Sequence, residues 1–371
     1  MRVEEYYGAG DEWDRFVGRT PGASFAHLAA WREVLSAVYG YRPLYFIAVG
    51  DDGEWLGALP LFEVRSRIFG RHLLSVPLMN AGGAVGTPEA RTRLAEFALE
   101  HARASGARSL VLRDRDVVAC NIPESRFKVT VLLDLPDSPE ALWNDGLRSK
   151  LRSQIRRAMK EAMEVRFGPD QLRAFHDVYS RNMRDLGTPA HPVGLFDAIA
   201  RAFAEHVIFG AVYWRGMPVA AGCGFLWRGT LEMTWASSLR EHNRMAPNML
   251  LYWSFMEEAI RRGARVFDFG RCSPGSGTHR FKLQWGGREV PLPWRVWSRD
   301  VERAGDRAGD LAPETAGSPA AETAGDPAAA GPAADPTARP AMRLARAAWR
   351  RLPHAVARRF GGAIARELPW W

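Results

Sequence analysis

The order of helix and strand patterns in this 371-residue chain occurs twice, and this repeat limits the possible folds more than any other feature. In the first half an amphipathic helix over residues 22–39 precedes several strands, and a long helix over 87–106 precedes two more. Thr87 and Pro88 mark the start of the long helix, and Gly106 marks its end. The strands of this half are expected at residues 44–50, 54–64, 73–83, 109–114 and 129–135.

The second half repeats this theme, with strands between and after its helices. The helices are expected near residues 138–162, 170–185, 195–204 and 247–262. Strands, a long helix and a strand, twice over, predict an α/β (α+β) fold of two mixed sheets flanked by helices. We therefore expect one domain over residues 1–137 and a second, catalytic domain over 138–302. No G-x-G-x-x-G or P-loop pattern occurs, which argues against NAD and ATP as ligands.

The composition is that of a globular enzyme. A chain with 47% hydrophobic and 25% charged residues is able to bury a large core in two domains. No apolar run reaches the roughly 18 residues of a membrane span, and the polar start does not read as a signal peptide, so a cytoplasmic protein is expected. The three cysteines are too few and too widely spaced for a disulfide framework or a C-x-x-C metal site.

The end of the chain differs in composition from the rest. Residues 303–340 are rich in Ala, Pro, Gly and Asp, and are expected to form a disordered linker. Residues 341–371 hold seven arginines against Glu367, which is most of the formal net charge of +8, so a general DNA-binding face on the body is not supported. Apolar residues recur there every fourth position, which predicts a basic amphipathic helix. It either contacts an anionic membrane surface or docks on the body or a partner.

The segment over residues 265–287, RVFDFGRCSPGSGTHRFKLQWGG, carries the chemistry. A strand pattern ends at Gly270, a polar glycine-rich loop follows, and Lys282 then lies between Phe281 and Trp285 in an apolar segment. Such a loop aims one cation into a cleft. The alternative is a strand lysine that points to solvent.

This segment resembles the end of the catalytic domain of FemAB-like proteins, aminoacyl and acyl transferases built from tandem acetyltransferase-like (GNAT) folds. The segments LRSKLRSQIRRAMKEAMEVRFG (147–168), VIFGAVYWRGMPVAAGCGFLWRGTLEMTWASSL (207–239) and NMLLYWSFMEEAIRRGARVFDFG (248–270) are similar to the rest of that domain. NMRDLGTPAH, APNMLLYW and FDFGR resemble the subgroup associated with exosortase and PEP-CTERM systems. The resemblance covers most of the chain and implies two tandem GNAT-like domains.

The resemblance implies catalytic roles for three residues. In acyl transfer to an amine a tetrahedral oxyanion forms, and Lys282 is implied to stabilise it by hydrogen bonding. Phe281 would help to hold the acyl donor, with core packing as its alternative. Asp268 is either a general base or a partner that orients Arg271 by an ion pair.

The resemblance also implies a substrate-binding surface. The basic helix that contains Arg152, Arg156, Arg157 and Lys160 corresponds to the helix that grips the diphosphate of a nucleotide-linked muropeptide, a task for which arginine is suited. A solvated helix face is the alternative. Arg271 and Asn248, in the matching FDFGR and APNMLLYW segments, are further substrate-binding candidates. Leu35 stands where muropeptide-using members carry lysine, so the acceptor need not be a peptidoglycan precursor.

Three functions remain open at this point. The first is N-acyl or aminoacyl transfer by direct amine attack on a peptidoglycan- or exopolysaccharide-related envelope precursor, nucleotide- or lipid-linked. The second is acyl-CoA-dependent acetyl transfer to an exopolysaccharide sugar or lipid-linked intermediate, and the third is a non-catalytic membrane or assembly scaffold. The donor is aminoacyl-tRNA, bound at its acceptor end, or acyl-CoA, and no tightly bound cofactor or metal is expected. Pro247 at the start of the helix over 247–262 lacks an amide for the CoA pyrophosphate, which favours aminoacyl-tRNA. A thiolate mechanism through Cys272, activated by Arg271 or His279, is the minor alternative.

Overall fold

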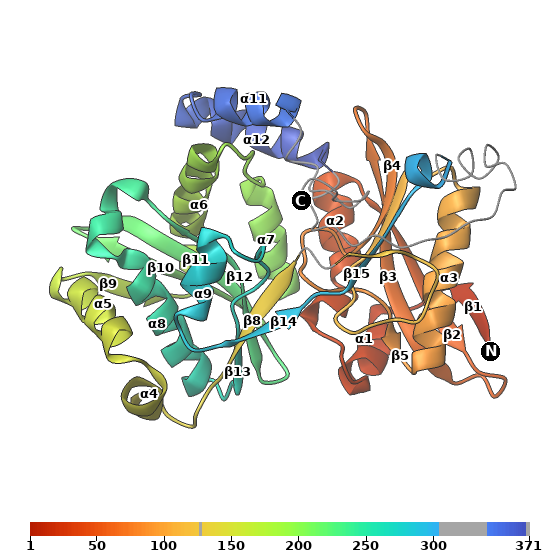
Figure 1. Cartoon of the computed structure of the whole chain (residues 1–371), viewed down its shortest axis with the longest axis horizontal. Helices are drawn as coiled ribbons and strands as arrows, with labels where there is room; N and C mark the ends of the chain where they lie inside the picture. The colour runs from red at the N-terminus through yellow and green to blue at the C-terminus, as the bar shows by residue number, and fades with distance from the viewer. Residues whose placement is uncertain (126–127, 304–339, 369–371) are drawn as a thin grey trace, which may run out of the picture.

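The computed structural model describes residues 1–125, 128–303 and 340–368. Two mixed β-sheets stand next to each other in it, each with its own helices (Figure 1). This arrangement confirms the expected α/β class with two mixed sheets. The linker expected over residues 303–340 lies outside the described residues except at its two ends, and so do Trp370 and Trp371.

The first sheet is formed by residues from both ends of the described body. Its strands are β1 (Arg2–Glu5), β2 (Arg42–Val49), β3 (Trp55–Ser66), β4 (Gly70–Ser75), β5 (Val85–Gly86), β6 (Ser109–Leu112), β7 (Glu124–Ser125) and β15 (Trp294–Ser298). They follow the order β1-β2-β3-β4-β6-β15-β7, with β5 paired to β3. Pro60 lacks an N–H, and it lies in β3 where the partner on one side changes from β5 to β4, so the ladder is already interrupted there.

The second sheet repeats the pairing pattern of the first. Its strands are β8 (Val129–Asp134), β9 (Glu164–Phe167), β10 (Val207–Trp214), β11 (Met217–Trp227), β12 (Thr230–Ser238), β13 (Val266–Asp268) and β14 (Arg288–Pro291). Their order is β9-β10-β11-β12-β13-β8-β14. In each sheet the fourth and fifth strands along this order are parallel, and the other neighbours are antiparallel. The two halves of the chain are therefore structural repeats.

The two halves exchange one strand each. β8 precedes the boundary expected at residues 137 and 138, but it pairs with β13 and β14 of the second sheet. β15 lies late in the chain, and it pairs with β6 and β7 of the first sheet. Division at residue 137 therefore does not separate the sheets. The sequence pattern predicts that a strand forms there, but the pattern carries no information on which strand it pairs with.

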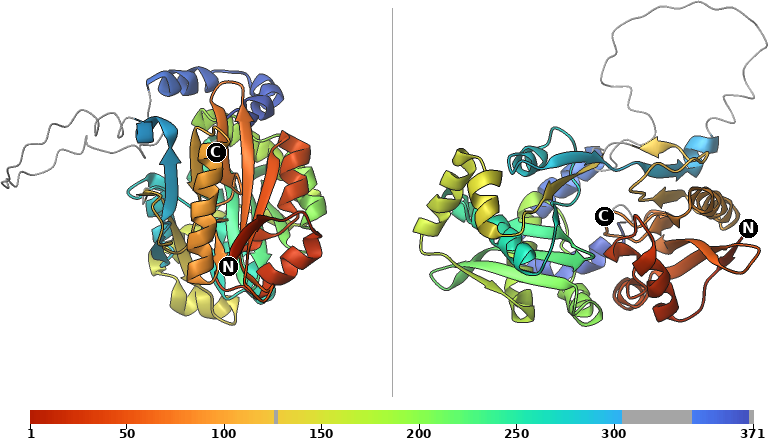
Figure 2. Two further views of the ribbon diagram at one scale, coloured as in Figure 1. Left: turned by 90° about the vertical axis from the view of Figure 1, so that its right-hand side faces the viewer. Right: turned by 90° about the horizontal axis from the view of Figure 1, so that it is seen from below.

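Helices cover the faces of both sheets (Figure 2). The first sheet is flanked by α1 (Gly10–Arg19), α2 (Trp31–Tyr39) and α3 (Pro88–Ala104). The second is flanked by α4 (Pro139–Ala141), α5 (Ser149–Lys160), α6 (Leu172–Leu186), α7 (Val193–Ala202), α8 (Pro247–Arg261) and α9 (Gly277–Leu283). Thr87 caps α3, since its side chain accepts a hydrogen bond from the N–H of Ala90, and Pro88 follows as the first helical residue.

Three expected elements differ from the structure. The helix expected over 22–39 begins only at Trp31, and Phe25–His27 before it form a 3₁₀ turn capped by Ser24. The helix expected over 138–162 is broken by a π-helical turn over Leu142–Gly146. The strand expected over 73–83 ends at Ser75, and positive φ angles at Val76 (28°) and Leu78 (76°) show why the extended chain cannot continue.

A continuous apolar core joins the two halves. The ring of Phe25 stacks on that of Phe225 from the second half, with centroids 4.2 Å apart and planes within 8°. Trp31 is fully buried, and its ring packs 4.6 Å from Phe203. Because buried aromatic side chains contribute several kcal/mol each, this contact holds the two sheets in a fixed relation.

The end of the chain folds back on the body. Helices α11 (Pro340–Trp349) and α12 (His354–Arg366) lie along its top edge, above α6 (Figure 1). Ala357, Gly361 and Ala365 recur every fourth residue on the buried face of α12. Of the two alternatives for this segment, docking on the body is therefore present in the structure. No helix among the described residues has the length and hydropathy to cross a bilayer.

Candidate active site

Two buried carboxylates lie at the end of the parallel strand pair in the second sheet. Glu232 of β12 is opposite Asp268 of β13 in the last pair that these strands form. A β-bulge follows at Thr234, because the partner of Cys223 is Trp235 whereas the partner of Gly224 is Met233. The bulge redirects β12, and β13 ends, so the two strands separate directly after the carboxylates.

Both carboxylates are enclosed and hydrogen-bonded. Asp268 accepts hydrogen bonds from the hydroxyl of Thr130 and from the N–H of Gly270, at 2.8 Å for the latter. Glu232 accepts one from Asn80 Nδ2 at 2.6 Å. Burial, reinforced by the negative charge of Asp268, raises the pKa of Glu232 to about 7. Glu232 is therefore poised to take or give a proton near neutral pH.

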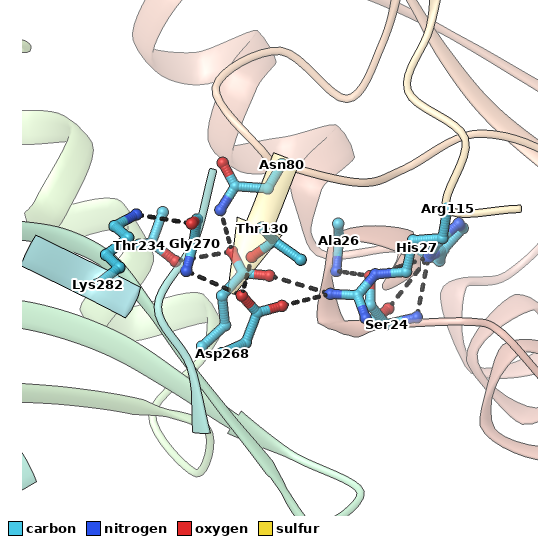
Figure 3. A network of polar contacts seen from close by, with 11 residues as sticks. Ser24, Ala26, His27, Asn80, Arg115, Thr130, Thr234, Asp268, Gly270 and Lys282 are labelled. Carbon is cyan, nitrogen blue, oxygen red and sulfur yellow. Dashed lines mark hydrogen bonds and ion pairs between the residues drawn. The ribbon is translucent and has the colours of Figure 1, made fainter. Parts of the chain in front are cut away.

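The first half supplies one cation to this site. Arg115, which follows β6, extends across the junction and donates to Asp268 at 2.9 Å and to Glu232 at 3.4 Å (Figure 3). Its positive charge lowers the pKa of Glu232, which limits the rise caused by burial. Asn80, in the loop after β4, comes from the first half as well. Both carboxylates therefore belong to the second half of the molecule, whereas their partners Arg115 and Asn80 belong to the first.

A buried histidine supports the first-half side of the junction. The N–H of Ser24 donates to Nδ1 of His27 at 3.0 Å, and Nε2 of His27 lies 3.1 Å from the carbonyl of Gly83. Burial lowers the pKa of His27 to about 4, so the ring is neutral at pH 7 and its Nε2–H donates to Gly83. The ring thereby fixes the loop that presents Asn80.

Lys282 lies next to the carboxylates, but in a different setting from the expected one. It is on helix α9 rather than on a strand or loop edge, and only 4% of it is exposed. Nζ donates to the carbonyls of Gly270 at 2.6 Å and of Arg271 at 3.0 Å. Burial lowers the pKa of Lys282 to about 8, although the charges of Asp268 and Glu232 oppose this shift. The lysine therefore also holds the loop after β13 in place, which a solvent-facing lysine would not do.

The neighbours of Lys282 have mainly structural contacts. Phe281 packs edge-on against Tyr252 of α8, with centroids 5.0 Å apart. Arg271 lies over the ring of Trp294 at 5.5 Å, and burial lowers its pKa. The ion pair considered between Asp268 and Arg271 is wrong, since the partner of Asp268 is Arg115.

Cys272 is not placed as a nucleophile. Its backbone N–H and carbonyl pair with Val129, and its side chain is buried. Burial raises the pKa of the Cys272 thiol, whereas a reactive thiolate needs a lowered one. His279, considered as its activator, instead contacts Glu289. The thiolate alternative therefore has no support in the geometry.

The basic residues of α5 lie away from this junction, beside β9 at the outer edge of the second sheet (Figure 1). Arg152 donates to the carbonyls of Trp143 and Asn144 at 2.9 and 2.7 Å, so it closes the end of the π-helical turn. Arg156 lies 5.3 Å over the ring of Trp143. Arg157 and Lys160 are exposed, and Lys160 borders a hollow of about 380 Å³ that the β10–β11 hairpin also lines. The structure does not bring these four residues together with Lys282.

Asn248 lies at the start of α8, which follows β12 through a 3₁₀ turn over Arg240–Met245. Pro247 before it has no N–H, and the N–H of Met249 donates to the carbonyl of Ala246 at 3.0 Å. Few amides therefore point outward from this helix start.

Sequence reasoning missed Glu232, Arg115, Asn80 and Thr130. A signal for Glu232 was present, because a lone carboxylate in the apolar strand LEMTW is costly to bury without a role. The partners had no such signal, since they come from loops and strands far away in the chain. Among the described residues, no group of three or more His, Cys, Asp or Glu side chains is placed to hold a metal ion.

Comparison with known proteins agrees with this geometry. Residues 146–283, which include Glu232, Asp268 and Lys282, match the model of the acetyltransferase (GNAT) domain. This part of the chain is a GNAT domain. No curated protein matches the sequence.

Solved structures extend the likeness to both halves. FemX has 15% sequence identity and a TM-score of 0.62, over 81% of this chain and 99% of its own. The C-terminal domain of a protein assigned as a lysylphosphatidylglycerol synthetase from Agrobacterium fabrum has 13% identity and a TM-score of 0.53. The match covers 81% of this chain and 96% of that domain. A tandem GNAT protein from the clavulanic acid biosynthesis pathway has 11% identity and a TM-score of 0.52, over 80% and 98%.

At these identities the likeness shows the fold alone. The expected FemAB-like tandem GNAT fold is confirmed, and the GNAT domain supports an acyltransferase. The exosortase-associated subgroup stays a prediction.

Proposed function

We propose that the protein is an N-acyltransferase of the FemAB-like kind, which transfers an aminoacyl or acyl group to an amine of a cell-envelope precursor. The observation that carries this proposal is the pair Glu232 and Asp268, which ends the parallel strands of the GNAT domain beside Lys282. Acyl transfer to an amine needs a group that accepts the amine's proton and a donor that stabilises the oxyanion. A titratable carboxylate and an ammonium group lie together where β12 and β13 separate, and they fit these two roles.

The proposed reaction uses the carboxylate for the proton and the lysine for the oxyanion. The acceptor amine attacks the acyl carbonyl, a C–N bond forms, and the amine's proton passes to Glu232. The ester or thioester bond to the donor then breaks, and the leaving oxygen or sulfur takes a proton. Within the described residues, two carbonyls account for two of the three N–H bonds of Lys282, and we assign the third to the oxyanion. Asp268 then serves to hold Arg115, Thr130 and the loop at Gly270.

The donor that we favour is aminoacyl-tRNA, held at its acceptor end. This choice rests on the start of α8, where Pro247 and the internal bond of Met249 leave little backbone N–H for a CoA pyrophosphate. The acceptor would be a nucleotide- or lipid-linked precursor of peptidoglycan or exopolysaccharide, with Arg156, Arg157 and Lys160 as its exposed phosphate contacts. A lipid-linked acceptor would place the enzyme at the inner face of the cell membrane.

Acyl-CoA-dependent N-acetylation of a sugar or lipid-linked intermediate is the second candidate. The observation in its favour is the match of residues 146–283 to the acetyltransferase domain itself. Retention of CoA by the purified protein would decide for it.

The experiment that tests the proposal is a transfer assay with both donors, radiolabelled aminoacyl-tRNA and acetyl-CoA, against amine-bearing envelope precursors. Lys282→Met is expected to lower turnover by roughly 100- to 1000-fold, the effect of one lost oxyanion donor. Because Lys282 also holds the loop at Gly270, Lys282→Arg is the matched variant that keeps a buried cation and donor. A Lys282→Met protein with wild-type turnover would exclude the proposed role.

A further inference from the structure

The outer surface of the tail helices combines exposed apolar side chains with arginines. Val356, Phe360 and Ile364 recur every fourth residue along α12, and they are 38%, 52% and 39% exposed. Leu344 of α11 is 74% exposed. A row of partly exposed apolar side chains at helical spacing is typical of a surface that contacts an apolar partner.

The first half adds to the same surface through the turn between β3 and β4. Glu367, which follows α12, accepts hydrogen bonds from the N–H of Arg67 at 2.6 Å and from the hydroxyl of Ser66 at 3.1 Å. The next residue in that turn, Ile68, is 70% exposed. We call the set Ile68, Leu344, Val356, Phe360 and Ile364 the tail face.

The side of α12 that carries Ala357, Gly361 and Ala365 is fixed to the body, and the row Val356, Phe360 and Ile364 lies about 100° round the helix from it. A Cβ added at Gly361 would stand 3.0 Å from the carbonyl oxygen of Ala190 and 3.1 Å from its nitrogen, which shows how closely the two backbones approach. The hydroxyl of Tyr41 donates to the carbonyl of Arg366 at 3.2 Å, and the ring of His354 lies 3.0 Å from the Ser180 hydroxyl. These contacts come from both halves.

Cations accompany the tail face along its length. Arg343, Arg350, Arg351, Arg358, Arg359 and Arg366 are all exposed. Two of them also contact the body, since Arg350 donates to the carbonyl of Leu186 and the Arg366 guanidinium lies beside Gly40. Glu367 is the one acidic residue from 341 to 371 in the sequence, and its carboxylate is already bound by the β3–β4 turn. The surface is therefore apolar and positive at once.

We propose that the tail face is a docking surface for an anionic lipid bilayer. The interface of such a bilayer takes apolar side chains into its outer acyl region, while arginines meet lipid phosphates beside them. Nucleic acid would use the arginines but leave Phe360 and Leu344 in water. This proposal goes beyond the transfer reaction and does not depend on it.

Docking of this kind would orient the whole enzyme. Since α12 is bonded to α6 through Ser180 and to the first half through Tyr41 and Ser66, the membrane would hold both halves rather than a free tail. The junction with Glu232 and Asp268 would keep one height and direction relative to the lipid headgroups.

Vesicle flotation of the full chain tests the proposal. The probes are vesicles of phosphatidylcholine alone and of phosphatidylcholine with 30% phosphatidylglycerol. One variant combines Val356→Ser, Phe360→Ser and Ile364→Ser, and a second combines Arg358→Gln, Arg359→Gln and Arg366→Gln. Met217→Ser is the control, because Met217 is an equally exposed apolar residue (54%) in the β10–β11 hairpin of the second half.

The wild type and the control are expected to float with the anionic vesicles and not with the neutral ones. Loss of three apolar side chains should lower the partition coefficient by about 10-fold or more, and loss of the arginines should remove most of its salt dependence. Unchanged melting temperatures show that the exposed substitutions leave the fold intact. Equal flotation of the wild type and the serine variant would overturn the proposal. Binding of tRNA that needs the arginines but not the apolar residues, without flotation, would overturn it in favour of a nucleic-acid surface.

Discussion

The two halves of the molecule share one strand pattern but differ in the side chains at the ends of their parallel strand pairs. In the second half the pair β12 and β13 ends in Glu232 and Asp268. In the first half the corresponding pair, β4 and β6, is followed directly by Arg113. The Arg113 guanidinium is buried and donates to the carbonyls of Val76 at 3.3 Å and Met79 at 2.6 Å.

This difference shows how a repeated fold has been divided into two roles. At the end of β6 in the first half, the Arg113 side chain is bound to the loop after β4. Two residues further on, Arg115 extends to the carboxylates of the other half. The first half therefore contributes a side chain to the carboxylate pair of the second.

Removal of the exchanged strand should disrupt the first half more than any other change. A chain that ends at residue 292 lacks β15, so β6 and β7 lose their shared neighbour and the buried Trp294 and Trp297 are missing. We expect this chain to lose cooperative unfolding and to aggregate through the open edge of β6. Tryptophan fluorescence measured in a urea titration reports the unfolding. A chain that ends at residue 303 retains β15 and should unfold cooperatively. Cooperative unfolding of the shorter chain would mean that the first sheet is independent of the exchange.

Neutralising the carboxylate of the second half should stop the chemistry. Glu232→Gln keeps the shape and the bond from Asn80, and turnover should fall by roughly 100- to 10,000-fold, the usual contribution of a general base. Wild-type kcat should rise with pH through about 7, as Glu232 loses its proton, and the variant should lack this limb.

The matched control for Glu232→Gln lies in the first half. Glu63 in β3 is just as buried, and it pairs with Arg71 at 3.4 Å. Glu63→Gln should leave turnover within about twofold while it changes stability. Equal losses in both variants would show that burial, and not the position at the strand opening, accounts for the effect.

Removal of the shared cation should shift the pH profile rather than abolish activity. Without Arg115 the pKa of Glu232 rises further, so the acid limb of kcat in Arg115→Gln should move up by roughly one pH unit. Activity should recover in part between pH 7 and pH 8, before Lys282, whose pKa is about 8, loses its own proton. Arg91→Gln, beside the exposed Asp116, is the control that leaves the limb in place. Absence of any rise over this range would assign Arg115 a purely structural role.

The smallest effect concerns a carboxyl group of the first half that affects stability alone. Burial raises the pKa of Asp114 to about 7 from its usual 3.8, so the folded protein holds this proton between about pH 4 and pH 7 while the unfolded chain releases it. Its contribution to the free energy of unfolding is complete below pH 4 and is lost as the pH rises through 7. Asp114→Asn should therefore be more stable than wild type at pH 8 but not at pH 5 in urea titrations, with unchanged turnover. An unaltered pH dependence would mean that Asp114 is ionised in the fold.

The duplicated architecture was predictable from the sequence because helix and strand periods are local. The exchange of β8 and β15 was not, since it depends on pairing between residues such as Arg295 and Leu112 that are far apart in the chain. At the site, the segment with Asp268 and Lys282 was predictable from its strand pattern and its glycine-rich loop. The orientation of Lys282 was not predictable, because FKLQW fits a strand and a helical turn equally well, and tertiary packing decides between them.

The α5 arginines show the opposite error, in which a local charge pattern is given too much weight. A run of cations looks like a binding surface, yet Arg152 is bonded to the carbonyls of Trp143 and Asn144. Whether a guanidinium meets substrate or backbone is decided by the turn before the helix, and the π-helical turn there has no clear signature in the sequence.

The strand exchange also sets the timing of biosynthesis. The ribosome completes β6 and β7 well before it reaches β15, and on the order of 10 to 30 s of translation separate them at usual elongation rates. During that interval the nascent first sheet lacks the strand between β6 and β7, so the unpaired edge of β6 is able to pair with another nascent chain. The half of the protein that leaves the ribosome first is the one that finishes folding last. The yield of folded protein in the cell therefore depends on whether the gap between β6 and β7 stays free of wrong pairing until β15 has been synthesised.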